Sequence, residues 1–133
     1  MQFVPPRDTL RVDQALRSWT DQAKLFAQGR TTPGEVVTDA APGYSWHEFG
    51  LAFDVVPLDV DLIPDWVLTH PIWQDIVTAG EALGLSSGSD FTHRKDTPHF
   101  QLTGRFPVTP TDAVRRLYQS SGMQAVWDAA GIG

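Results

Sequence analysis

The sequence predicts a small mixed fold of short strands and amphipathic helices in a single domain, residues 1–133. A chain of 133 residues has the usual length of one domain. Apolar residues alternate with polar ones in two segments and form a short, mostly apolar run in a third, and they recur at helical spacing in the segments between and after these. The predicted strands are residues 9–16, 50–56 and 98–103; the predicted helices are residues 19–28, residues 71–83 and two after Thr109-Pro110-Thr111 that Gly122 separates.

Residues with known preferences for helix ends support the first two helices. Ser18 or Thr20 can cap the first helix, and Gly29 ends it. Pro71 fits the first turn of the second helix, and Gly84 fits its end.

Two polar segments rich in glycine, proline or serine are predicted to be loops. Residues 30–43 form the longer one, and a loop of this length in a small domain is usually functional or disordered. Because this segment leads directly into His47, we favour a functional loop. Residues 86–95 are the second predicted loop.

The predicted central strand carries an aspartate, Asp54, among apolar residues. An interval of seven residues separates it from His47, which would place the two on opposite faces of one continuous strand. Gly50 lies between them and allows the chain to bend, so that His47 can approach from a preceding turn. In the last strand we expect Phe100 and Leu102 to face the core, and His99 and Gln101 to face a site.

Composition excludes several classes of function. The net charge of −6 without a basic run argues against binding of nucleic acid or of an anionic membrane surface. The absence of cysteine excludes disulfides, thiolate catalysis and cysteine-bound zinc. No apolar run approaches the roughly 20 residues that span a bilayer, and residues 1–8 do not read as a signal peptide. We therefore expect no membrane insertion.

Two histidines and two aspartates suggest hydrolytic metal chemistry. His47, Asp54 and His99 would be costly to bury unless they are paired or bind a metal. Such a set holds zinc while leaving one position open for water. Asp96, three residues before His99, can then act as general base, because Pro98 favours an extended chain between them. Arg17 is the candidate cation for the developing negative charge on the carbonyl oxygen.

These residues resemble a known family. Its pattern SxHxxGxAxD is reproduced from Ser45 to Asp54, and its downstream Asp/Glu-x-x-His by Asp96 and His99. The chain is similar to the zinc peptidases that cut bacterial cell-wall peptides. These include D-Ala-D-Ala carboxypeptidases, vancomycin-resistance-type dipeptidases and L-Ala-D-Glu endopeptidases of phage endolysins, and the wider group includes the hedgehog signalling domain. The segment RSWTDQAKLFAQGRTTPG is similar to the endopeptidase branch.

The resemblance implies an α+β fold in which helices pack on a small antiparallel sheet with zinc in a groove. It also implies one Zn²⁺ per chain and a role for each matching residue. The implied metal ligands are His47, Asp54 and His99; the implied catalytic residues are Asp96 and Arg17; the expected substrate-binding residues are Ser45, Arg30, His93 and Gln101. Segment 86–95 departs from the family because it lacks a tryptophan-rich stretch, so that His93 or Phe91 would have to replace part of the substrate wall.

The favoured hypothesis is a peptidoglycan L-alanyl-D-glutamate endopeptidase. A D-alanyl-D-alanine carboxypeptidase is the alternative within the family, in which Arg30 would bind the free carboxylate of the substrate. A metal-binding module without catalysis and a structural domain of a phage particle are alternatives of other classes. We expect a monomer that acts at the cell wall or in the periplasm; if a phage encodes it, it stays cytoplasmic until release.

Overall fold

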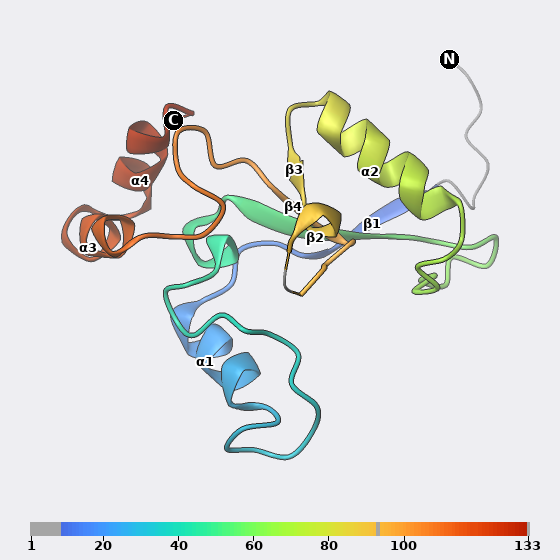
Figure 1. The fold of residues 1–133 in the computed structure, drawn as a ribbon, viewed down its shortest axis with the longest axis horizontal. Coiled ribbons are helices and arrows are strands. Elements are labelled where there is room, and N and C mark those ends of the chain that lie inside the picture. Colours follow the sequence, from blue (N-terminus) through green and yellow to red (C-terminus); the bar gives the residue numbers. More distant parts are fainter. Residues whose placement is uncertain (1–8, 93, 133) are drawn as a thin grey trace. The chain divides into compact units, whose positions relative to one another are not determined.

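The computed structural model describes residues 9–92 and 94–132, which are drawn in colour in Figure 1. These residues fall into two compact units. Of the described residues, the first unit comprises 9–15, 53–92 and 94–102, and the second comprises 16–52 and 103–132. Each unit has its own hydrophobic core.

The sheet belongs to the first unit, apart from the first residue of β2, and has the strand order β1-β2-β4-β3, which can be followed in Figure 1. Its strands are β1 (Leu10–Gln14), β2 (Ala52–Pro57), β4 (His99–Gln101) and β3 (Ser86–Ser87). β1 pairs antiparallel with β2, and β3 pairs antiparallel with β4. The Val55 amide donates to the Pro98 carbonyl at 3.0 Å, beside the start of β4. This arrangement places Asp54 and His99 on neighbouring strands.

Helix α2 (Ile72–Ala82) supplies the apolar cover of this sheet. Its buried residues pack with the buried residues of β2 and β4 in one cluster. Gly80 is required where the helix meets β4, because an added Cβ atom would lie 2.3 Å from the Phe100 ring. Phe100 therefore faces the core, as predicted. The buried cluster consists of Val55, Val56, Trp73, Ile76, Val77 and Phe100.

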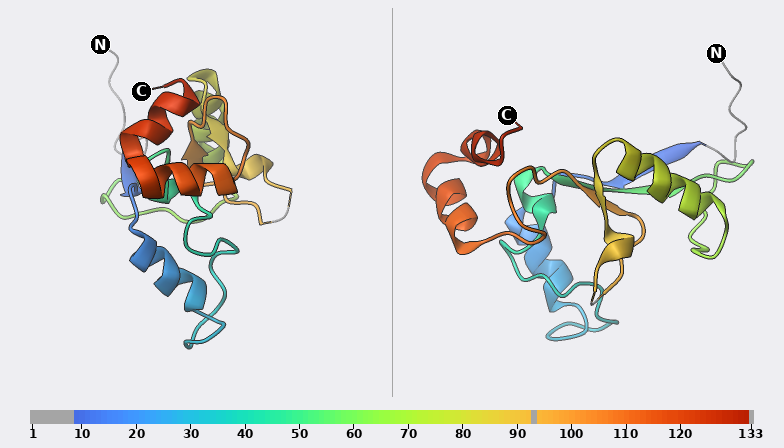
Figure 2. Two further views of the ribbon diagram at one scale, coloured as in Figure 1. Left: turned by 90° about the vertical axis from the view of Figure 1, so that its left-hand side faces the viewer. Right: turned by 45° about the horizontal axis from the view of Figure 1, so that its top comes forward.

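The second unit is helical. It contains α1 (Trp19–Ala27), the 3₁₀ turn η2 (Trp46–Phe49), α3 (Asp112–Ser121) and α4 (Met123–Ala130), the last two lying side by side in Figure 2. Ser18 caps α1 by accepting from the Asp21 amide at 3.0 Å. Gly122 separates α3 from α4, as the sequence predicted. Trp46, Phe49, Leu51, Ala52, Val114 and Val126 form the core.

The predicted α+β fold with a small antiparallel sheet is confirmed, but two local predictions are wrong. Segment 86–95 is not wholly a loop, because β3 and a 3₁₀ turn, η3 (Gly88–Asp90), lie within it. The short strand escaped prediction because its serines give no apolar alternation, and it exists through its pairing with β4. Leu102 does not face the core: it follows the end of β4 and is 42% exposed. In the described part of the chain, no helix combines the length and apolar character that crossing a bilayer requires.

Candidate metal centre

His47 lies on the capped turn η2 in the second unit, and not on a strand. The Ser45 hydroxyl accepts from the His47 amide at 3.3 Å and caps the turn. Gly50 ends the turn with a φ of 68°, a left-handed conformation that glycine adopts without strain. The bend predicted at Gly50 is therefore present. SxHxxG, the first half of the pattern, therefore encodes a capped turn. This turn fixes His47, which is only 3% exposed.

Glu48 was not singled out by the sequence analysis, yet it organises the loop before His47. Its carboxylate accepts from the amides of Gly43 at 2.7 Å and Ser45 at 3.1 Å, and the residue is buried. Burial raises the pKa of Glu48, although these hydrogen bonds and the nearby Arg17 charge oppose the shift. The capping-box spacing from Ser45 to Glu48 is the signal that could have identified it.

Arg17 is tied to the same turn through its backbone and its side chain. Its amide donates to the His47 carbonyl at 3.1 Å, and its Nη1 donates to Oε1 of Gln22 at 2.8 Å. Gln22 is fully buried and donates through Nε2 to the Ala40 carbonyl at 2.7 Å. Gln22, which the site prediction missed, therefore connects the Arg17 guanidinium to loop 30–43. A glutamine on the buried side of a short helix gives no clear sequence signal for such a contact.

In the first unit, β2 and β4 bring Asp54 and His99 together. Nδ1 of His99 lies 3.4 Å from Oδ1 of Asp54, and Nε2 lies 2.8 Å from Oε1 of Gln101. Burial lowers the pKa of His99, but the hydrogen bonds of Asp54 and Gln101 and the charges of Asp54 and Asp96 raise it, and the net pKa is raised.

Asp96 lies in the turn that leads into β4. Its amide donates to the Gly88 carbonyl at 2.9 Å, and its carbonyl accepts from the His99 amide at 3.0 Å. The Phe91 ring lies 5.4 Å from the His99 ring, centroid to centroid. These backbone hydrogen bonds fix the conformation of the turn between Asp96, the predicted base, and His99, the predicted ligand.

His47, Asp54 and His99 form a group that could hold a metal ion. One ligand atom of each lies within 4.8 Å of the others, and both histidines are buried. Among the described residues no other set of three such side chains meets this condition. Two imidazole nitrogens and one carboxylate oxygen are donors that zinc accepts, so the donor set fits the ion that the sequence predicted.

Three of the predicted substrate-binding residues, Arg30, Ser45 and His93, differ in what surrounds them. Arg30 donates to the carbonyls of Phe26 at 2.8 Å and Thr38 at 3.0 Å, so that its guanidinium holds its own loop together. Ser45 caps η2, as described above. His93 lies outside the described residues, and its predicted contact with substrate stays a prediction.

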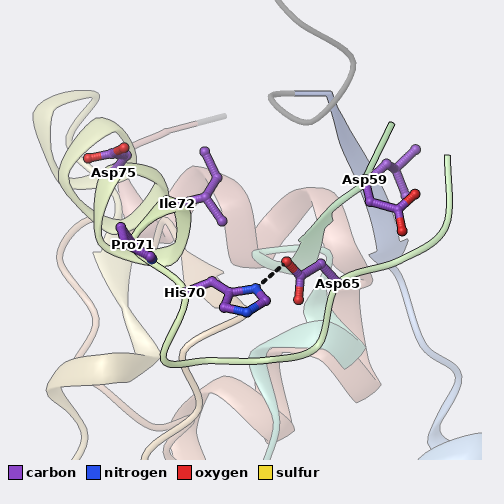
Figure 3. Close-up of a pocket in the computed structure, with 7 residues that line it drawn as sticks. Asp59, Asp65, His70, Pro71, Ile72 and Asp75 are labelled. Carbon is purple, nitrogen blue, oxygen red and sulfur yellow. Dashed lines mark hydrogen bonds and ion pairs between the residues drawn. The ribbon is translucent and has the colours of Figure 1, made fainter. Parts of the chain in front are cut away.

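A separate pocket of the first unit shares no residue with this group. Leu58, Asp59, Asp65, His70, Pro71, Ile72 and Asp75 line it (Figure 3). Nδ1 of His70 lies 2.6 Å from Oδ2 of Asp65, the contact drawn as a dashed line in Figure 3. This hydrogen bond lowers the pKa of Asp65.

Replacing His70 by alanine is expected to raise the pKa of Asp65 toward its ordinary value. The pair adds stability above the unfolded-state pKa of Asp65, and this contribution is lost as the pH falls through the lower folded-state pKa. An NMR titration of the Asp65 carboxyl carbon measures the shift. The exposed Gln74→Ala on α2 is the control, and an Asp65 pKa that is the same in His70→Ala and wild type would contradict the assignment.

Comparison with known proteins finds similarity to peptidases. Residues 38–102 match the family model described as D-alanyl-D-alanine carboxypeptidase. The chain is 32% identical over 98 residues to the peptidoglycan L-alanyl-D-glutamate endopeptidase CwlK of Bacillus subtilis, a match that covers 68% of this chain and 59% of CwlK. The chain thus spans less than two thirds of that curated relative.

A solved structure, that of the L-Ala D-Glu endopeptidase ChiX of Serratia marcescens, is similar with a TM-score of 0.48 and 26% identity. The match covers 72% of this chain and 68% of that one. The family match is the informative comparison, because residues 38–102 include the whole SxHxxGxAxD segment as well as Asp96 and His99. The resemblance that the sequence suggested is confirmed by this match: residues 38–102 are similar to the family described as D-alanyl-D-alanine carboxypeptidase, and the chain is similar to CwlK.

Proposed function

We propose that this protein is a zinc-dependent peptidase that hydrolyses the bond between L-alanine and D-glutamate in peptidoglycan stem peptides. The observation that carries the proposal is the group of His47, Asp54 and His99, whose ligand atoms lie within 4.8 Å of one another in a region of peptidase family sequence. The choice of bond follows CwlK, whose name assigns it to the L-alanyl-D-glutamate bond.

The three ligands would hold one zinc ion per chain. A zinc ion bound by three protein ligands supplies a Lewis acid and lowers the pKa of a coordinated water to about 7. The surroundings of the ligands suit this role, because the capped turn at Ser45 fixes His47 and the paired strands fix Asp54 and His99.

Asp96 would act as the general base and acid. Its carboxylate would take the proton of the attacking water and then deliver it to the leaving amine. Arg17 would face the carbonyl oxygen as negative charge develops there, and its bond to the buried Gln22 restricts its guanidinium before substrate arrives. Restricting a charged donor in advance reduces the reorganisation needed in the transition state.

In this proposal the two units act as one catalytic domain and the protein works as a monomer on the cell wall. A D-alanyl-D-alanine carboxypeptidase is the second candidate, because the matching family model carries that description. Arg30 would be the residue to bind a terminal carboxylate, but its bonds to Phe26 and Thr38 favour a structural role. A metal-binding module without catalysis is less favoured, because the position of the base is still an aspartate.

Metal analysis and digestion of a defined muropeptide test the proposal together. We expect one zinc per chain and a new fragment with the mass for cleavage after L-alanine, and both should disappear after treatment with a chelator and return with added zinc. Release of D-alanine alone would identify the carboxypeptidase. Zinc without cleavage would favour the binding module, and a protein that binds no zinc would refute the proposed centre.

A further inference from the structure

Gln101 shares its face of β4 with the proposed ligand His99. Side chains two residues apart on a strand point to the same face, and the intervening Phe100 packs in the core, 6.0 Å from the Phe53 ring. Gln101 is 2% exposed and His99 is 6% exposed. A glutamine buried this deeply has little surface to offer a substrate, although the sequence suggested that role.

The two nitrogens of the His99 ring have different neighbours. Nε2 lies 2.8 Å from the amide oxygen of Gln101, whereas Nδ1 lies 3.4 Å from Oδ1 of Asp54. An amide oxygen can only accept a hydrogen bond, so Nε2 must carry the hydrogen in this contact. A protonated ring can donate to both acceptors, but a neutral ring has a single N–H. If that hydrogen stays in the shorter contact, with Gln101, Nδ1 keeps its lone pair on the side of Asp54.

We propose that Gln101 is a positioning residue: its amide oxygen keeps the hydrogen of His99 on Nε2, so that Nδ1 is the atom offered to the metal. An imidazole binds a metal through an unprotonated nitrogen, and the partner of its other nitrogen selects the tautomer and fixes the ring plane. The inference rests on the proposed metal centre, but it concerns a property of the protein that exists without the metal.

If the amide of Gln101 were turned over, so that its nitrogen faced Nε2 of His99, the predicted tautomer of His99 would be the other one. Its NH₂ group would then donate to Nε2 of His99, and the hydrogen would reside on Nδ1, facing Asp54. The ring would have no nitrogen ready for a metal beside Asp54. The tautomer of His99 therefore decides between the two orientations.

The test uses the full chain without metal, labelled with ¹⁵N-histidine, at a pH where His99 is neutral. We expect the wild-type spectrum to show His99 with hydrogen on Nε2. Gln101→Met removes the acceptor and should give a mixture of tautomers, whereas Gln101→Glu retains an acceptor and should restore the Nε2–H form. The exposed Gln74→Met, on α2, should leave the tautomer as in wild type.

Zinc affinity gives a second readout that does not depend on catalysis. Competition with a chelator should show affinity about 10–100-fold weaker for Gln101→Met than for wild type, the usual effect of losing a partner of a metal ligand, with Gln74→Met unchanged. A wild-type spectrum that shows the hydrogen of His99 on Nδ1 would overturn the inference, even if Gln101→Met did not fold. So would a Gln101→Met protein with unchanged tautomer and zinc affinity but a raised KM, because that result identifies a substrate contact. Absence of peptide hydrolysis in the wild type would instead refute the proposed function and leave the tautomer result intact.

Discussion

Asp96→Asn is expected to reduce the rate of muropeptide hydrolysis by about 10²–10⁴-fold, the usual contribution of a general base. The neutral amide has nearly the same shape as the carboxylate but cannot take a proton from water. The turn should survive, because Asp96 joins Gly88 and His99 through backbone groups that the substitution leaves in place. Steady-state kinetics at saturating zinc measure kcat, and elemental analysis checks that one zinc per chain remains.

Asp61→Asn is the matched control for this prediction. It makes the same chemical change at an exposed loop residue of the same unit, so activity should match wild type. If Asp96→Asn lost zinc along with activity, the role of Asp96 would be structural. If it kept both zinc and near-wild-type kcat, another group would be the base and the proposed mechanism would be wrong.

The sequence was most informative where one short segment determines its own structure. Apolar spacing and end signals located α1, α2, α3 and α4, because amphipathic helices are encoded locally. The bend at Gly50 was also predictable, because a histidine and an aspartate seven residues apart can approach one another only if the strand is interrupted between them. The family pattern then indicated which side chains to place together.

Sequence reasoning failed where a residue's role depends on a distant partner. β3 has no strand pattern of its own and exists by pairing with β4. Gln22 and Gln101 are amides whose partners, Arg17 and His99, become apparent only when the fold is known. Glutamine is mostly found at protein surfaces, so a buried one is not expected from composition. These two amides and the buried Glu48 share a feature: each hydrogen bonds to a proposed functional residue or to the loop that carries one.

The role of Gly88 could not be predicted from the sequence either. It is a glycine in a serine-rich segment, and it has no sequence feature that separates it from a flexible linker residue. In the structure it is buried, and a Cβ atom added there would lie 2.1 Å from the carbonyl oxygen of Asp96 and 2.9 Å from Cβ of His99. The close approach lets the Gly88 carbonyl accept from the Asp96 amide at 2.9 Å. The absence of a side chain here therefore permits the turn that carries the base.

Gly88→Ala is accordingly expected to impair both stability and metal binding. The neighbour is backbone, which cannot rotate away, so the turn must shift; overpacking of this kind costs about 1–3 kcal/mol, and occasionally more. Because His99 follows the same turn, zinc affinity should fall too. Thermal unfolding and chelator competition measure the two effects.

Gly84→Ala separates this clash from the general effect of replacing a glycine. Gly84 has a φ of +90°, so alanine is strained there by about 1–2 kcal/mol, but an added Cβ atom meets nothing within 4 Å. This variant should lose some stability and keep wild-type zinc affinity, whereas Gly88→Ala should lose both. Equal zinc affinity in the two variants would mean that the turn from Gly88 to Asp96 does not hold His99 in place. In that case the position of His99 would depend on its strand pairing and on Gln101 alone.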